Sequence, residues 1–196
     1  MKKVFIVVLV IIVLSSCSSN RAFYNITLND VVCLNEKISV DESNIVNVFN
    51  VKENSTSKYE DRSISIVWEL QRKQLCFALE NRKEIAIKIL WDEAVYVDEA
   101  NQSYKLMHVG VDYAGKNEKR SDAILAPMSK INETVVPSKN IYPVNGEYGG
   151  WVCSNLLKRD KTSLLGERIK VLLPIEVKGK RFDYYFTFNI SSKVKS

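Results

Sequence analysis

Apolar and polar residues alternate with a period of two over several stretches of this chain, which is the pattern of a strand with one buried face. The clearest stretch lies near the carboxyl end, where the alternation runs over residues 169–175 and again over residues 182–190. Lys178 and Gly179 separate the two runs and predict a turn. We therefore predict a carboxyl-terminal hairpin whose second strand places five large apolar side chains on one face, as a central element of the core.

The same pattern predicts further strands along the rest of the chain. They cover residues 23–32, 45–51, 63–70, 75–79, 85–91, 95–98, 103–109, 123–127 and 134–137, with a polar break over 52–58. We expect the three between 63 and 91 to form an antiparallel meander, and the next two to form a hairpin. Only residues 154–165 could hold a short helix. Many short strands separated by turns predict an all-β fold, an antiparallel β-sandwich of about seven to nine strands.

The first seventeen residues have the composition of an export signal. Lys2 and Lys3 precede an uninterrupted apolar run over residues 4–14, which is too short to cross a bilayer as a helix. The run ends in the sequence Leu-Ser-Ser-Cys at Cys17. This segment resembles the bacterial lipobox, in which the signal is cut before a cysteine that carries fatty acyl chains such as palmitate.

Lipidation at Cys17 predicts a protein held on a membrane by acyl chains, since two chains are enough for stable anchoring. We expect residues 1–16 to be the signal peptide, residues 17–22 a lipidated tether, and residues 23–196 a single domain. Ser18 is not the aspartate that retains lipoproteins at the inner membrane in the sorting pathway that is known best. The sequence thus favours an outer-membrane location in a bacterial envelope.

The charge of the chain excludes one class of partner. The formal net charge is +5, and removal of Lys2 and Lys3 with the signal lowers it to +3. Basic and acidic residues interleave and form no long block of one sign, so there is no footprint for nucleic acid. The partners that we expect are the membrane, through Cys17, and a protein of the envelope.

Three cysteines remain beside Cys17, and their spacing contains no Cys-x-x-Cys pair. In an oxidising envelope we expect one disulfide and one free thiol, although the sequence allows any pairing. Cys76 lies in an apolar run and is expected to pack as a small hydrophobic residue, which leaves Cys33 with Cys153. A zinc site needs more ligands than these and the single His108 supply, so no metal and no cofactor are expected.

Two sets of residues are candidates for a functional site. Asp92, Glu93, Asp98 and His108 could serve a hydrolase or a glycan-binding protein, but no serine elbow or phosphate-binding loop accompanies them. Residues 142–151 are rich in glycine and aromatic residues and predict a structured surface loop. Its aromatic side chains could form a surface that binds a protein or a glycan; they are Tyr142, Tyr148 and Trp151.

The central part of the chain resembles a family of small bacterial lipoproteins of unknown function. The resemblance is carried by Trp68, by residues 75–82 and by residues 85–98, which include an Ile-x-Ile-x-Trp-Asp motif. His108-Val109-Gly110 and the proline-bounded segment 124–137 continue the pattern. The resemblance implies an immunoglobulin-like sandwich and brings no activity with it.

These observations together favour a non-enzymatic envelope lipoprotein that binds another protein or supports an envelope assembly. The alternative is a glycan-binding or hydrolytic envelope protein that uses the acidic residues and His108.

Overall fold

The structure is a computed structural model that describes residues 22–35, 45–49, 55–109, 120–145, 150–157 and 164–195. Within these ranges it consists of strands, with two short 3-10 helices at η2 (Trp91–Glu93) and η4 (Ser138–Asn140). The strands are β1 (Ala22–Cys33), β2 (Ile45–Phe49), β3 (Ser55–Glu60), β4 (Ile64–Leu70), β5 (Leu75–Asn81), β6 (Ile87–Ile89), β7 (Val95–Val97), β8 (Ser103–His108), β9 (Ala123–Leu125), β10 (Lys130–Pro137), β11 (Ile141–Val144), β12 (Gly150–Cys153), β13 (Arg168–Val177) and β14 (Lys180–Lys195). No helix in these described ranges is long and apolar enough to span a membrane.

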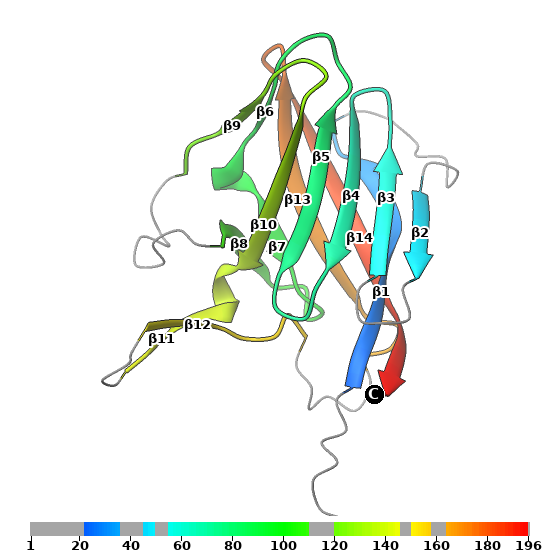
Figure 1. Ribbon diagram of the computed structural model, residues 1–196, viewed down its shortest axis with the longest axis vertical. Helices are drawn as coiled ribbons and strands as arrows, with labels where there is room; N and C mark the ends of the chain where they lie inside the picture. Colours follow the sequence, from blue (N-terminus) through cyan, green and yellow to red (C-terminus); the bar gives the residue numbers. More distant parts are fainter. Residues whose placement is uncertain are drawn as a thin grey trace, which may run out of the picture.

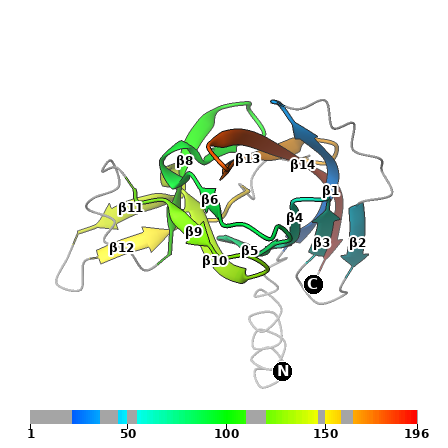
Figure 2. The same cartoon turned by 90° about the horizontal axis from the view of Figure 1, so that it is seen from above.

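Most of the strands belong to one antiparallel sheet that curves into a nearly closed barrel. Ten of them follow one another in the order β1-β14-β13-β7-β8-β10-β5-β4-β3-β2. Figure 2 shows the sheet wrapped around the core, with β1 and β2, its two ends, close together. The immunoglobulin-like sandwich expected from the sequence is therefore wrong. Strands of a sandwich and of a barrel both bury every second residue, so the alternation could not separate the two folds.

Strand β13 is the element around which the barrel closes. It pairs with β14 along its whole length, from Arg168 to Val177. On its other side it pairs with β7 toward one end and with β6 toward the other, and β6 in turn pairs with β9. The expected meander over residues 63–91 is thus only partly correct: β4 and β5 are neighbours, but β6 leaves them for β13.

Side chains bridge the seam between β1 and β2, where no strand pairing is formed. The Asn47 side chain accepts a hydrogen bond from the Leu28 N–H at 3.2 Å and donates one to the Leu28 C=O at 2.9 Å. Ser57 Oγ also accepts from the Leu28 N–H, at 3.1 Å. Register shifts on either side of Leu28 show that β1 bends here. The Asn47 amide therefore replaces a peptide group of a neighbouring strand and holds the barrel together at its seam.

The two ends of the barrel differ, and we call them the base and the far end. The base contains the start of β1, the end of β10, and the turns β4–β5 and β7–β8. The far end contains Cys33 and the turns β3–β4 and β13–β14. Figure 1 shows the base at the bottom, with the start of β1 and the end of β14 side by side.

Aromatic side chains fill the inside of the barrel. The Trp68 ring lies 4.7 Å from Phe77, 5.2 Å from Phe186 and 5.7 Å from Phe188, measured between ring centroids. All four are at most 2% exposed. The barrel interior is consequently a packed core of the kind that small barrels have.

Two buried tyrosines and an aspartate close the core toward the far end. The hydroxyl groups of Tyr59 and Tyr184 both donate to Asp61 Oδ2, at 3.0 and 2.8 Å. Burial, followed by the charge of Asp61, holds the pKa of both tyrosines well above the ordinary value. The other carboxylate oxygen of Asp61 accepts from the N–H groups of Ser63 and Ile64, so this one side chain ties the β3–β4 turn to β14.

The sequence predicted several of these strands well and missed others. The carboxyl-terminal hairpin is confirmed, and its turn residues Lys178 and Gly179 both have positive φ, at 50° and 73°. Strand β3 falls partly in the expected polar break over 52–58, because its only large apolar side chain is Tyr59. Residues 154–157 are not helical, and residues 158–163 of the expected helix lie outside the described residues.

The expected Cys33–Cys153 disulfide is wrong. All three described cysteines are free thiols. Cys33 pairs with Tyr184 at the far end of the barrel, whereas the Cys153 thiol lies 3.3 Å from the Lys73 carbonyl in the β4–β5 turn at the base. Strand β4 separates these ends by about 20 Å, at ~3.3 Å per residue, far beyond the reach of a disulfide. Cys76, expected in the core, is half-buried and lies next to Thr134 on the outside of the barrel wall.

Candidate functional site: the projecting hairpin

Strands β11 and β12 form a separate two-stranded sheet that projects from the base of the barrel (Figure 1). The register places Tyr142 opposite Val152 and Pro143 opposite Trp151. Opposed residues of an antiparallel pair share one face of the sheet, and successive residues alternate between faces. Tyr142, Val144 and Val152 therefore lie on one face, which we call the outer face, and Trp151 lies on the other. Of the surface loop expected over residues 142–151, residues 142–144 and 150–151 thus lie in paired strands, and residues 146–149 lie outside the described residues.

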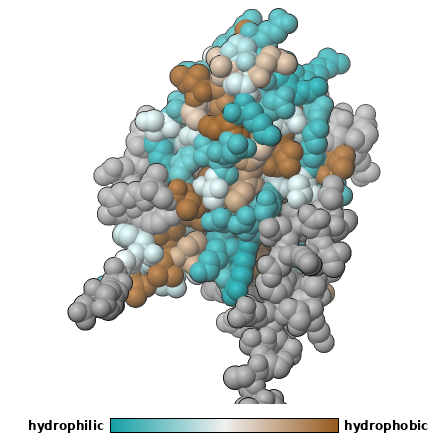
Figure 3. All heavy atoms as spheres, viewed as in Figure 1, coloured by the Kyte–Doolittle hydropathy of each residue, from teal (hydrophilic) through white to brown (hydrophobic). Residues whose placement is uncertain are grey.

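The hairpin carries four of the exposed large apolar side chains of the described residues. Tyr142 is 45% exposed, Val144 42%, Trp151 38% and Val152 38%. Among the exposed large apolar side chains of the described residues, the two aromatic ones are both here. The described residues of the hairpin carry no charged side chain. In Figure 3 hydrophobic residues gather at the lower left, where the hairpin leaves the barrel. Exposed apolar side chains that gather at one place make the hairpin a candidate contact surface.

A small apolar cluster attaches the hairpin to the outside of the barrel wall. Ile141 packs with Met107 of β8 and Val136 of β10, which are at most 3% exposed, and Cys153 packs against them. Ile141 and Cys153 are opposed, so the face that meets the wall is the one that also carries Trp151. The outer face consequently points away from the barrel. Burial raises the pKa of the Cys153 thiol, which is the opposite of an activated thiolate.

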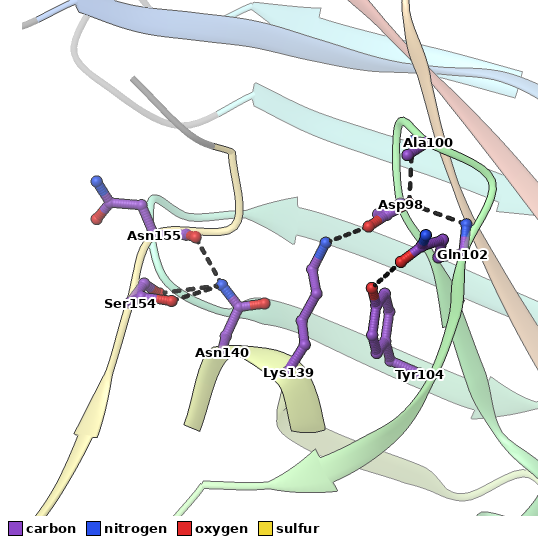
Figure 4. Close-up of polar contacts among 8 residues, drawn as sticks. All are labelled: Asp98, Ala100, Gln102, Tyr104, Lys139, Asn140, Ser154 and Asn155. Atoms are coloured by element: carbon purple, nitrogen blue, oxygen red, sulfur yellow. Dashed lines mark hydrogen bonds and ion pairs between the residues drawn. The ribbon is translucent and has the colours of Figure 1, made fainter. Parts of the chain in front are cut away.

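Polar contacts hold both ends of the hairpin (Figure 4). Before β11, Lys139 of η4 makes an ion pair with Asp98 at 2.6 Å, and its ammonium lies 4.7 Å from the centre of the Tyr104 ring. The Asn140 side chain crosses to the end of β12 and donates to Ser154 Oγ at 2.9 Å and to the Asn155 carbonyl at 2.6 Å. We call these contacts the base clamp, and they fix the direction in which the hairpin projects.

Asp98 belongs to the base clamp and organises the β7–β8 turn. Its Oδ1 accepts from the N–H groups of Ala100 and Gln102, both at 2.9 Å, and Asn101 has a positive φ of 59°. Burial alone would raise the pKa of Asp98, but the bonds from Lys139, Gln102 and Ala100 outweigh burial and lower it. Asp98 is therefore a carboxylate with a structural partner for each of its oxygens.

The other candidate acidic residues and His108 make separate pairs. Asp92 lies 2.9 Å from Lys105 and Glu93 pairs with Arg181, while His108 Nδ1 lies 2.9 Å from Glu133. With Asp98 bound to Lys139, each of the four residues has a different partner. The described part of the chain brings no three His, Cys, Asp or Glu side chains together as a metal site. The structure thus does not assemble these residues into one centre.

Two of the predicted functional residues, Cys17 and Tyr148, lie outside the described residues. Tyr142 and Trp151 are on the hairpin as candidates for partner binding, and each lies on its own face. Sequence reasoning missed Val144 and Val152, because only aromatic residues were considered there. It also missed Lys139 and Asn140, and no signal in the sequence distinguishes these two from ordinary surface residues.

Comparisons with models of protein families, with curated proteins and with solved structures found no match for this chain.

Proposed function

We propose that this protein is a lipid-anchored, non-enzymatic component of a bacterial envelope that binds another protein through the β11–β12 hairpin. The observation that carries the proposal is the apolar surface of β11 and β12, whose described residues carry no charge and which project from a barrel whose own core is packed. Exposed aromatic and aliphatic side chains at one place supply the desolvated centre that protein interfaces need. The base clamp supports the same role, because a pre-organised arm loses less entropy on binding.

The lipobox at Cys17 supplies the anchor in this proposal. Acyl chains on Cys17 would keep the protein on one membrane, and Ser18 favours the outer membrane. A membrane-bound protein meets partners of the same envelope at a high effective concentration, so a modest contact surface is sufficient. The function proposed is therefore binding and assembly, and it involves no chemical step.

Site-specific photo-crosslinking in the cells that make the protein tests this function. A photoreactive amino acid replaces Tyr142 in one variant and Ile124 in the control variant. Ile124 lies on β9 toward the far end and is 69% exposed, so it is at least as accessible as Tyr142. We expect one discrete crosslinked protein from position 142 and none from position 124. Equal labelling from both positions, or no crosslinked protein from position 142, contradicts the proposal.

A further inference from the structure

We propose that the protein bound by the hairpin is a resident of the membrane that holds the lipid anchor, and not a soluble protein of the envelope. This inference rests on the proposed function and identifies the class of partner for the same site. It follows from where the hairpin lies relative to the anchored end of the chain and from the direction of its outer face.

The anchor and the hairpin are at the same end of the barrel. Cys17 precedes Ala22, the first residue of β1, by five positions in the sequence. Five residues span at most about 18 Å when fully extended, so the start of β1 stays within this distance of the lipid headgroups. The hairpin follows η4 directly after β10 ends at the base. Both the base and the hairpin are therefore held close to the bilayer.

The outer face of the hairpin is turned toward the membrane side. The hairpin is seen edge-on in Figure 1 and face-on in Figure 2, so its plane lies across the barrel axis. On the opposite face, Ile141 and Cys153 at the root of the hairpin pack on Met107 and Val136 of the barrel wall. Tyr142, Val144 and Val152 consequently look away from the barrel in the direction of the base. A partner that covers them lies between the hairpin and the bilayer, or protrudes from the bilayer itself.

A protein fits this place better than lipid does. The hydrocarbon of a bilayer accepts no open sheet edge, because backbone groups there have no partner, and a two-stranded sheet consists of two edge strands. The outer face carries three partly exposed side chains and no cation for anionic headgroups. A membrane protein with an apolar patch above the bilayer surface can cover the outer face and also pair with a sheet edge.

The test changes the height of the barrel above the membrane and leaves the hairpin intact. A rigid helical spacer of about 30 residues, made of Glu-Ala-Ala-Ala-Lys repeats and inserted between Ser19 and Asn20, lifts the barrel by roughly 45 Å. A flexible Gly/Ser insert of the same length is the matched control, because it allows the barrel to return to the surface. Both variants carry the photoreactive residue at position 142 in full-length, anchored protein, and protease resistance confirms that each barrel is folded.

We expect the chain without an insert to crosslink one protein, and we expect the uncrosslinked form of that protein to stay with the membrane after an alkaline wash. The rigid spacer should lower the yield at least about tenfold, and the flexible insert should lower it less, since it reduces only the effective concentration. An equal yield with the rigid spacer overturns the membrane-resident partner and leaves the proposed function standing. Crosslinks to lipid alone, or no crosslinked protein without an insert, overturn both.

Discussion

The base clamp makes a quantitative prediction about the ion pair between Asp98 and Lys139. Their side chains are 7% and 22% exposed, so the pair lies between a surface ion pair, which contributes up to about 1 kcal/mol, and a buried pair, whose disruption costs about 3–5 kcal/mol. We predict a coupling energy of about 1–2 kcal/mol from a double-mutant cycle of Asp98→Asn and Lys139→Met. Asparagine is chosen because its amide oxygen still accepts from the turn N–H groups.

The matched control is the pair between Asp92 and Lys105. This pair also joins an aspartate to a lysine and connects η2 with β8, but its side chains are 31% and 44% exposed. The cycle of Asp92→Asn and Lys105→Met should give a coupling energy of about 0.5 kcal/mol or less. The free energy of unfolding is measured in urea, with the fluorescence of the buried Trp68 and Trp91 as the signal. Equal coupling energies in the two cycles refute the reasoning that burial at the base clamp strengthens the pair.

The same carboxylate predicts how stability depends on pH. The pKa of Asp98 is lowered in the folded protein. Its contribution to the free energy of unfolding is therefore complete above the pKa of an ordinary carboxyl group, and it is lost as the pH falls through the pKa of Asp98 in the folded protein. The free energy of unfolding of Asp98→Asn should therefore fall less steeply below about pH 4 than that of the unsubstituted protein. Parallel curves for the two proteins contradict this prediction.

Three further predictions concern the seam, the far end and the hairpin. Asn47→Ala should lower the free energy of unfolding by about 1–3 kcal/mol, measured in urea, because the Leu28 C=O loses its Asn47 donor and the Leu28 N–H keeps only Ser57 of its two side-chain acceptors. Tyr59 and Tyr184, which are bonded to Asp61, stay neutral in the folded protein because their pKa is raised. In unfolding experiments from pH 8 to 11, the free energy of unfolding should stay constant up to about pH 10 and fall above it, because the tyrosines then ionise in the unfolded chain. Tyr142→Ser with Val152→Ser should change stability by at most about 0.5 kcal/mol yet abolish crosslinking from position 144, since both side chains are exposed. A large loss of stability in this double variant, or undiminished crosslinking from position 144, contradicts the last prediction.

The strands of this fold were predictable wherever apolar residues alternate over a long stretch. Residues 169–190 gave both the strands and the turn of the β13–β14 hairpin, because every second side chain there enters the core. Strand β3 was not predictable from the same rule, since Ser57 is buried but polar and Tyr59 alone supplies apolar bulk. Strand β3, next to the seam, can bury Ser57 because the serine hydroxyl bonds the Leu28 backbone of β1.

The closure of the barrel could not be predicted from the sequence, for a different physical reason. It depends on which strands meet in space, and the two neighbours of β13 other than β14 come from distant, very short segments. The same limitation explains the wrong Cys33–Cys153 disulfide, which remained after Cys76 was assigned to the core, because the sequence does not show that Cys33 and Cys153 lie at opposite ends of the barrel. Tyr142 and Trp151, in contrast, were predicted as surface residues because glycine and proline beside aromatic residues are typical of exposed turns.

Oxidative footprinting of the unsubstituted protein is the most direct test of the hairpin as a contact surface. Hydroxyl radicals label Tyr142 and Met128, which are 45% and 63% exposed at opposite ends of the barrel, in intact cells and in purified protein. If the hairpin is covered by a partner, labelling of Tyr142 falls several-fold in cells relative to Met128. If both residues are labelled in the same ratio in cells and in purified protein, the hairpin is bare in the envelope and the account is contradicted.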